Sequence, residues 1–188
     1  MTDEEVLKTR EHNRELCKKY PFLIPSNRWS GKRITDCAAG EKGYWPGAPD
    51  DIPEYDYEFT ELDDMPEGWR IAFGDQLLEE LKDELVKANY LNDYRITQIK
   101  EKYGMLRIYD AGCTEKWYRE ILPKYVELSK HTCILCGEPA QWISRGWISP
   151  YCDKCAREIS EENKYHTGEY TNYFVPIDEY YSDDEGTD

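Results

Sequence analysis

The sequence lacks the signatures of several large protein classes. Its 188 residues contain no apolar run near the roughly 20 residues that a membrane-spanning helix needs. They also contain no glycine-rich phosphate loop, no dinucleotide-binding fingerprint and no Gly-x-Ser-x-Gly nucleophile motif. The charged stretch at residues 1–16 has no apolar centre, so we expect no secretory signal there and a cytoplasmic location. These absences argue against a membrane protein and against the commonest nucleotide-dependent enzymes and serine hydrolases.

Positive charge is missing from two long segments. Residues 48–68 hold nine Asp and Glu, residues 165–188 hold seven, and neither segment has a Lys or Arg. The other 23 of the 39 acids are balanced by the 24 Lys and Arg of the chain, whose net charge is −15. The rest of the protein is therefore close to neutral. This argues against a general nucleic-acid binder, which uses Lys and Arg to replace phosphate counterions.

Hydrophobic periodicity predicts a mixture of helices and strands. Thr2 and Glu5 form the pattern of a capping box that opens a helix ending near residue 19. Tyrosine and phenylalanine alternate with acids over residues 55–59, which predicts a strand. A further helix capped by Asp75 is expected to end near residue 89. Its core-facing stripe consists of Leu77, Leu78, Leu81, Leu85 and Ala88.

The middle of the chain predicts a hairpin followed by a helix. Residues 94–112 have the pattern of two strands that turn near Tyr103 and Gly104. Thr114 can cap a helix over about 115–130, which Pro123 must kink or restart. The apolar stripe of that helix is Trp117, Ile121, Tyr125 and Leu128.

Four of the seven cysteines form two Cys-x-x-Cys pairs. Cys133 and Cys136 are separated from Cys152 and Cys155 by fifteen residues, which is the spacing of a zinc site. Each pair directs two sulfurs to one side, and two pairs complete a tetrahedron around the ion. We expect one Zn²⁺ in a structural role, because four thiolates leave no position for a catalytic water.

The residues around these pairs predict the fold of the metal module. A hairpin turning at Arg145 and Gly146 should separate the pairs, and a helix should follow the second pair. Its strands would carry Trp142, Ile143, Trp147 and Ile148. The expected fold is α+β, a helix–β-hairpin–helix layer with a C-terminal treble-clef or zinc-ribbon-like module.

The expected division of the chain has three parts. An α+β domain at 1–132 would include a long acidic loop at about 31–68. The zinc module would occupy 133–160, and an acidic, tyrosine-rich tail would occupy 161–188.

The two acidic segments are the candidate partner-binding surfaces. Carboxylates interleaved with tyrosines imitate a nucleic acid, and they suit a partner protein with a basic surface, such as a host nuclease. Their expected contact residues are Asp50, Asp51, Glu54, Tyr55, Asp56, Tyr57, Glu58, Asp63, Asp64, Asp178, Glu179, Tyr180, Tyr181, Asp183 and Asp184. Direct nucleic-acid binding is the weaker expectation.

Two alternative functions depend on other residues. A nucleic-acid-binding or regulatory zinc protein would use basic and aromatic residues, namely Lys100, Lys102, Tyr103, Arg107, Tyr109 and Arg145. A metal-dependent hydrolase would use Asp63, Asp64 and Glu67 as ligands of Mg²⁺.

Several segments carry a resemblance to a family. The stretches YPFLIPSNRW, YEFTELDDMPEGWRIAFG, YRITQIKEKYGMLRIYDAG and the four-cysteine module resemble a widespread set of small proteins from phages and gut bacteria. Members of that family share a K-E-K-[YF]-G-x-L-R-x-Y segment followed by a zinc module with an internal Gly-Trp. The resemblance covers about residues 16–156 and implies a phage or mobile-element protein in a bacterial cell, with no activity attached. We therefore expect a non-enzymatic zinc protein that acts by protein binding, in the manner of an anti-CRISPR inhibitor.

Overall fold

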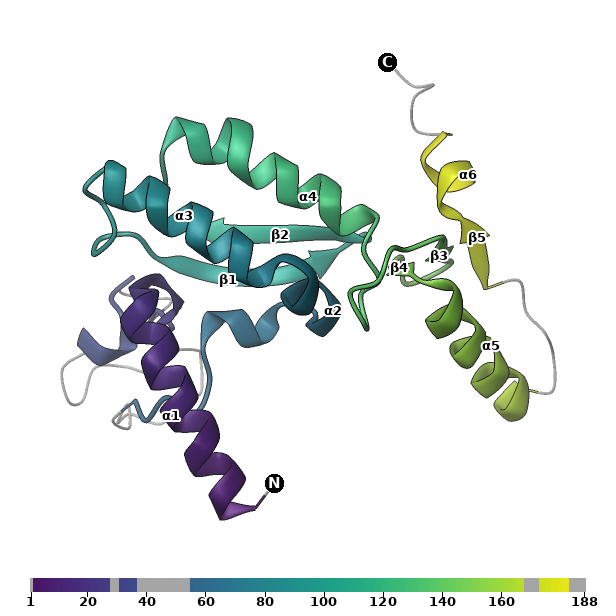
Figure 1. Cartoon of the computed structure of the whole chain (residues 1–188), viewed down its shortest axis with the longest axis horizontal. Coiled ribbons are helices and arrows are strands. Elements are labelled where there is room, and N and C mark those ends of the chain that lie inside the picture. Colours follow the sequence, from purple (N-terminus) through teal and green to yellow (C-terminus); the bar gives the residue numbers. More distant parts are fainter. Residues whose placement is uncertain (1, 28–30, 37–54, 168–172, 183–188) are drawn as a thin grey trace. The chain divides into compact units, whose positions relative to one another are not determined.

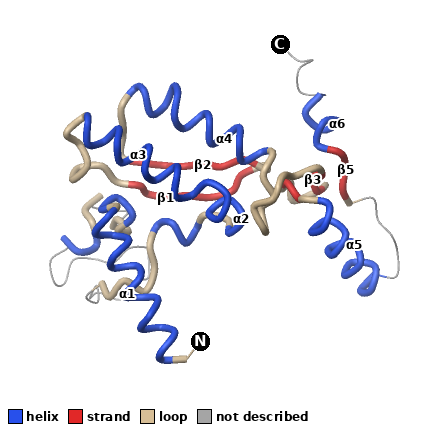
Figure 2. Tube along the Cα trace, viewed as in Figure 1, coloured by secondary structure: helices blue, strands red, loops and turns tan. Residues whose placement is uncertain are grey.

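The computed structural model describes residues 2–27, 31–36, 55–167 and 173–182 (Figure 1). The fold is α+β, with helices and two small sheets (Figure 2). The chain divides into two compact units. The first consists of Met1–Asp64, Leu78–Ile99 and Ile108–Tyr118, and the second of Met65–Leu77, Lys100–Arg107 and Arg119–Asp188. The division at residues 132 and 160 expected from the sequence stays a prediction.

Helix α1 (Asp3–Lys19) opens the first unit with the predicted capping box. The Thr2 N–H donates to Glu5 Oε2 at 2.6 Å, and the Glu5 N–H donates to Thr2 Oγ1 at 3.3 Å. The 3₁₀ helix η1 (Pro21–Leu23) follows at once, because Pro21 cannot continue the hydrogen bonding of α1. Phe22 and Leu23 are fully buried.

A continuous helical segment follows Pro66. It comprises α2 (Glu67–Trp69), the π-helical η4 (Arg70–Gly74) and α3 (Asp75–Lys87). The predicted cap at Asp75 is therefore wrong, because helical backbone already precedes that residue. The predicted leucine stripe is confirmed, with exposures of 0–1%, but Ala88 is exposed because α3 ends at Lys87.

Strands β1 (Ile96–Lys102) and β2 (Met105–Asp110) form the predicted hairpin as a two-stranded sheet (Figure 2). Tyr103 and Gly104 connect them with φ angles of 55° and 75°. Two consecutive positive φ values are typical of the type I′ turn, whose twist matches that of the flanking strands. The Gly104 N–H also donates to Glu101 Oε1 at 2.6 Å, which fixes the turn.

The predicted helix at 115–130 contains a π-helical turn, η5 (Trp117–Ile121), before α4 (Leu122–Lys130). Thr114 Oγ1 accepts the Trp117 N–H at 3.1 Å, which confirms the predicted cap. A π turn inserts one extra residue just before Pro123, where an α-helical hydrogen bond would be lost. The added residue changes the buried face, so Ser129 is buried and the predicted Leu128 is 40% exposed.

The second unit contains the metal module and the end of the described chain. Strands β3 (Trp142–Ser144), β4 (Pro150–Tyr151) and β5 (Phe174–Pro176) form an antiparallel sheet in the order β4-β3-β5. Helix α5 (Asp153–Thr167) follows β4, and α6 (Ile177–Ser182) follows β5 (Figure 1). The expected helix after the second cysteine pair is confirmed. Part of the expected acidic tail is thus a strand and a helix, with Ile177 buried.

The acidic loop expected at about 31–68 is described only in part. It contains the 3₁₀ helices η2 (Ile34–Asp36) and η3 (Glu61–Asp64), while residues 37–54 lie outside the described chain. The predicted strand at 55–59 is wrong, because these residues form bends and irregular backbone. Tyr57 has a φ of 65°, which is incompatible with a strand.

Each unit has its own buried side chains. The most buried ones in the first unit are Tyr20, Phe22, Leu23, Leu78, Leu81, Leu85, Tyr94, Ile96, Ile99 and Trp117. The most buried apolar side chains of the second unit are Met65, Trp69, Phe73, Leu77, Leu106, Tyr125, Cys133 and Ile143. None of the helices that the structure describes combines the length and the apolar character needed to cross a membrane.

Candidate metal centre

The four predicted cysteines meet in the second unit. Their sulfur atoms all lie within 4.8 Å of one another. The Cys136 Sγ atom is 3.5 Å from Cys152 Sγ and 3.7 Å from Cys155 Sγ. Four sulfurs placed tetrahedrally around Zn²⁺ at 2.3 Å would be separated by about 3.8 Å. The cluster therefore has the donor set and the size to hold one metal ion.

The first pair lies in a tight knuckle. Backbone hydrogen bonds close it, because the Gly137 N–H donates to Cys133 O at 3.0 Å and the Cys133 N–H donates to Glu138 O at 2.8 Å. Gly137 has a φ of 81°, a conformation that glycine adopts without a steric penalty. The knuckle is tied to β4, since the Ile134 N–H donates to Pro150 O at 2.9 Å.

The second pair lies where α5 begins. Cys152 directly precedes the helix, and its sulfur is 3.5 Å from the Cys155 N–H nitrogen in the first turn. The positive end of a helix favours a thiolate there. Asp153 anchors this end by accepting the Trp142 Nε1–H at 2.8 Å, while its own N–H donates to Gln141 Oε1 at 3.0 Å.

The thiols of the cluster differ in acidity. Burial raises the pKa values of Cys136 and Cys155 above their ordinary range. Burial also opposes ionisation of Cys152, but hydrogen bonds from the Cys155 N–H and from neighbouring thiols hold its pKa below the ordinary value. Cys136 and Cys155 resist ionisation, so a bound cation has to displace their protons and its binding weakens as the pH falls.

Helix α2 packs against the first knuckle at very short range. A Cβ atom built on Gly68 would lie 2.1 Å from Cys133 O and 2.7 Å from Gly137 N. The Gly68 N–H donates to Ile134 O at 2.9 Å, and the Trp69 Nε1–H donates to Thr132 O at 3.0 Å. We did not expect this contact from the sequence. Its only local signal is the Pro-Glu-Gly-Trp string, in which a glycine lies in the first turn of a helix and a tryptophan follows it.

The other candidate metal ligands do not join a cluster. Within the described residues, the four cysteines are the only group of three or more Cys, His, Asp or Glu whose ligand atoms lie close together. His131 is two residues before the first ligand, but its Nε2 lies 3.4 Å from Glu127 Oε1. Asp63 Oδ2 accepts the Thr60 N–H at 2.7 Å, which caps a turn. The hydrolase prediction at Asp63, Asp64 and Glu67 thus has no geometric counterpart.

The expected partner-binding acids are exposed wherever the structure describes them. They are Asp56, Glu58, Asp63, Asp64, Asp178 and Glu179. Arg10 pairs with Asp56 at 2.7 Å, so part of this charge is neutralised within the first unit. The remaining acids of the prediction lie outside the described residues, namely Asp50, Asp51, Glu54, Asp183 and Asp184.

The tyrosines of the same prediction are half-buried. In the first unit, Tyr55 and Tyr57 pack with ring centroids 4.8 Å apart, and Arg14 lies 5.1 Å from the Tyr57 ring centroid. In the second unit, Tyr181 packs against Tyr180 and His131 at 5.2 Å and 6.0 Å. The tyrosines thus contribute less free surface than the alternating pattern implies.

The basic strip expected for a nucleic-acid binder is not uniformly exposed. Lys102 and Tyr103 are exposed, but Lys100 and Arg107 are half-buried. Trp147, which we expected on a strand, lies in the loop between β3 and β4 and is 74% exposed. Sequence periodicity missed this residue because the strands are only three and two residues long.

The chain has no match among known proteins in three comparisons. No family model, no curated protein and no solved structure matches it. What the protein does must therefore follow from its own residues.

Proposed function

We propose that the four cysteines hold one structural zinc ion and that the chain acts by binding another protein. Zinc fits the donor set, since paired Cys-x-x-Cys motifs with fifteen residues between them are typical of zinc. The order of a knuckle, the β3–β4 hairpin and α5 supports a treble-clef module. Four sulfurs fill the coordination shell, so the ion serves architecture and leaves no open position for a reacting water.

The partner of this proposal is a protein with a basic surface. The observation that carries it is the segregation of charge, with nine acids and no base over residues 48–68. Among the described acids of the two segments Glu61 is buried and the others face solvent, which is the arrangement that steers a basic partner. Complementary charge of this kind raises association rates more than it raises affinity.

A nuclease of host defence is the first target class to examine. Such an enzyme presents a basic groove to nucleic-acid phosphates, and an acidic protein surface can occupy that groove. The resemblance to phage proteins supports an inhibitor of this type, cytoplasmic in a bacterial cell. The chain would then work without catalysis.

The test combines metal analysis with capture of a partner. Purified chain should contain one zinc per molecule, and its cobalt-substituted form should show the charge-transfer bands of four thiolates. In one variant, the Asp and Glu of residues 48–68 and 178–188 are replaced by Asn and Gln. This variant should no longer bind or inhibit a basic nuclease that the wild type inhibits. Inhibition that is unchanged by neutralisation and by added salt would contradict the proposal.

A further inference from the structure

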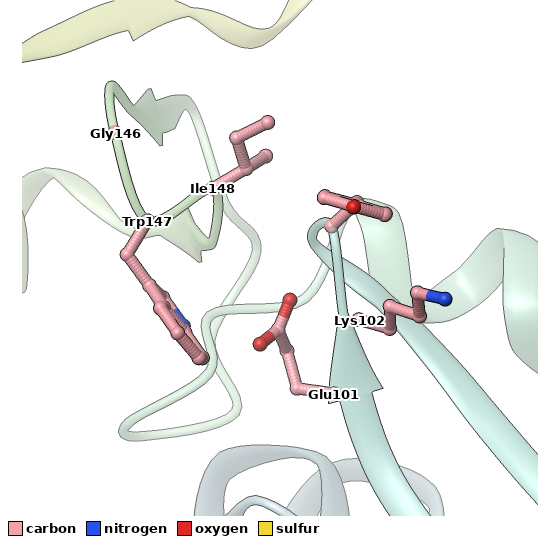
Figure 3. Close-up of a pocket in the computed structure, with 6 residues that line it drawn as sticks. Glu101, Lys102, Gly146, Trp147 and Ile148 are labelled. Atoms are coloured by element: carbon pink, nitrogen blue, oxygen red, sulfur yellow. The ribbon is translucent and has the colours of Figure 1, made fainter.

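A hollow lies between the turn of the β1–β2 hairpin and the loop that joins β3 to β4 (Figure 3). Its volume is about 250 Å³, and it belongs entirely to the second unit. Its lining residues are Glu101, Lys102, Tyr103, Gly146, Trp147 and Ile148. Trp147 is the most exposed large apolar side chain among the described residues, at 74%, and Tyr103 is 64% exposed. Exposed indole on a hollow is typical of an interface anchor.

The loop that carries Trp147 is fixed by hydrogen bonds from buried groups. Ser144 Oγ donates to Trp147 O at 2.5 Å and accepts the Ser149 N–H at 3.0 Å. The Arg145 N–H donates to Tyr173 O at 2.6 Å. Because the loop is held on both sides of Trp147, a ligand that contacts the indole does not have to order the loop first.

One carboxylate faces the indole. Figure 3 shows Glu101 beside Trp147, while Lys102 extends away from it. Glu101 Oε1 accepts the Gly104 N–H at 2.6 Å, which fixes the carboxylate and leaves it further lone pairs for a ligand. The Lys102 Nζ lies 5.5 Å from the Tyr103 ring centroid. The hollow therefore combines an aromatic face with a held negative charge.

We propose that this hollow binds an arginine side chain of the basic partner protein, an inference that rests on the proposed function. A guanidinium group is planar, so it stacks on the Trp147 indole while its N–H groups donate to the Glu101 carboxylate. Lysine supplies charge without a planar surface and binds less well there.

Charge selects this occupant over a nucleobase. A base could stack on Trp147, but its phosphates would be repelled by the Glu101 carboxylate in the same hollow. A guanidinium is attracted to that carboxylate. Arginine is also enriched among the residues that dominate binding at protein interfaces.

The test uses the full chain with its metal and a fluorescein-labelled nona-arginine peptide as the probe. Fluorescence anisotropy at moderate salt should show that Trp147→Ala weakens binding at least about tenfold, as expected for an interface anchor. Trp147→Phe should retain most of the affinity, and Glu101→Gln should lose about as much as Trp147→Ala. Nona-lysine should bind the wild type more weakly than nona-arginine does.

Two matched variants serve as controls. Leu7→Ala removes another exposed apolar side chain, and Glu11→Gln removes one exposed charge, both on α1. Each should leave the affinity within about twofold, the range expected for residues outside the contact. All variants should keep one metal per chain and the wild-type melting curve, since the altered side chains are not buried.

Three results would overturn the inference. The first is a Trp147→Ala variant that binds nona-arginine as tightly as Leu7→Ala does. The second is nona-lysine binding as tightly as nona-arginine. The third is tighter binding of a labelled oligothymidylate than of the peptide, lost in Trp147→Ala, which would assign the hollow to nucleic acid.

One further variant separates this inference from the proposed function. In it, the acids of 48–68 and 178–188 are replaced by Asn and Gln, and the hollow is left intact. If this variant loses the peptide and Trp147→Ala does not, the proposed function stands and the arginine site fails. If Trp147→Ala loses the peptide and the neutralised variant keeps it, the arginine site stands and the acidic surfaces fail as the partner-binding feature.

Discussion

The apolar core of the first unit and the cysteine module of the second are held together by different means. In the first unit, Leu78, Leu81 and Leu85 are buried from one face of α3 to 0–1% exposure. In the module, strands of three and two residues surround a buried cluster whose members are cysteines. Segments below about 40 residues rarely bury enough apolar surface to fold without a metal or disulfide. The comparison indicates that strands this short bury too little apolar surface to hold the module, so its stability should come from the proposed bonds to one ion.

The largest expected effect comes from breaking the metal site. Cys152→Ser should unfold residues 131–160, because a structural zinc contributes an apparent ~10–16 kcal/mol in small modules. Cys113→Ser, which changes a cysteine outside the cluster, should leave the module folded. Zinc content and amide hydrogen exchange measure both variants. Equal protection of residues 131–160 with and without the ion would refute the metal's structural role.

A cavity in the apolar core should lower the stability of the first unit and leave the cysteine module intact. Leu81→Ala should lower the free energy of unfolding by about 2–5 kcal/mol, since Leu81 is fully buried. The zinc content of the folded protein should stay at one per chain. Val86→Ala is the control, because Val86 is 55% exposed and should change stability by less than about 0.5 kcal/mol. Denaturant titration provides the measurement, and loss of zinc in the folded Leu81→Ala protein would show that the two regions are not stabilised separately.

A smaller effect is expected at the contact between α2 and the knuckle. Gly68→Ala places a methyl group 2.1 Å from Cys133 O, so it should destabilise the fold by about 1–3 kcal/mol or more and weaken metal retention. Gly74→Ala is the matched control in the same helical segment, where the nearest atom would be 3.4 Å away on the Arg70 side chain. Competition with a chelator compares the two variants. The packing argument fails if both variants release zinc at the same rate.

The smallest expected effect is a pH dependence in the first unit. Burial raises the pKa of Cys17 to about 11 from an ordinary value of 9.0. Below pH 9 the Cys17 thiol is protonated in both the folded and the unfolded chain, so it does not make the unfolding free energy depend on pH. Between pH 9 and 11 only the unfolded chain ionises, so stability should fall as the pH rises through this window.

The Cys17→Ala variant tests this assignment. Its unfolding free energy should change less than that of the wild type between pH 8 and pH 10.5, as measured by denaturant titration. The sign is opposite to that expected for zinc binding, which weakens as the pH falls. A wild-type stability that rises over this range would show that the thiol does not titrate as described.

Local signals predicted much of the fold and all four members of the cysteine cluster. The capping box at Thr2, the turn at Tyr103 and Gly104 and the cysteine spacing each depend on residues close in sequence, so the sequence alone specifies them. The π turn before Pro123 was not predictable from periodicity, and it exchanges Leu128 for Ser129 on the buried face. That exchange matters, because Ser129 Oγ accepts the Leu106 N–H at 2.9 Å.

The features that we missed depend on contacts between distant residues. Gly68 looks like a poor helix residue until the knuckle, more than sixty residues later, occupies the space of its missing side chain. Residues 174–176 look like part of a polar tail, yet they pair with β3. The exposure of Trp147 likewise follows from the shortness of β3 and β4, which no periodic pattern reveals.

The late position of β5 matters for how the protein is made. During synthesis all four sulfurs leave the ribosome well before residues 174–176, so an ion can close the knuckles while one edge of β3 is still bare. Bare edges recruit strands from other chains. Truncated variants that end before Phe174 should keep their metal but aggregate through the unpaired edge of β3. A purification tag is therefore better placed at the N-terminus, and the C-terminal residues should be kept.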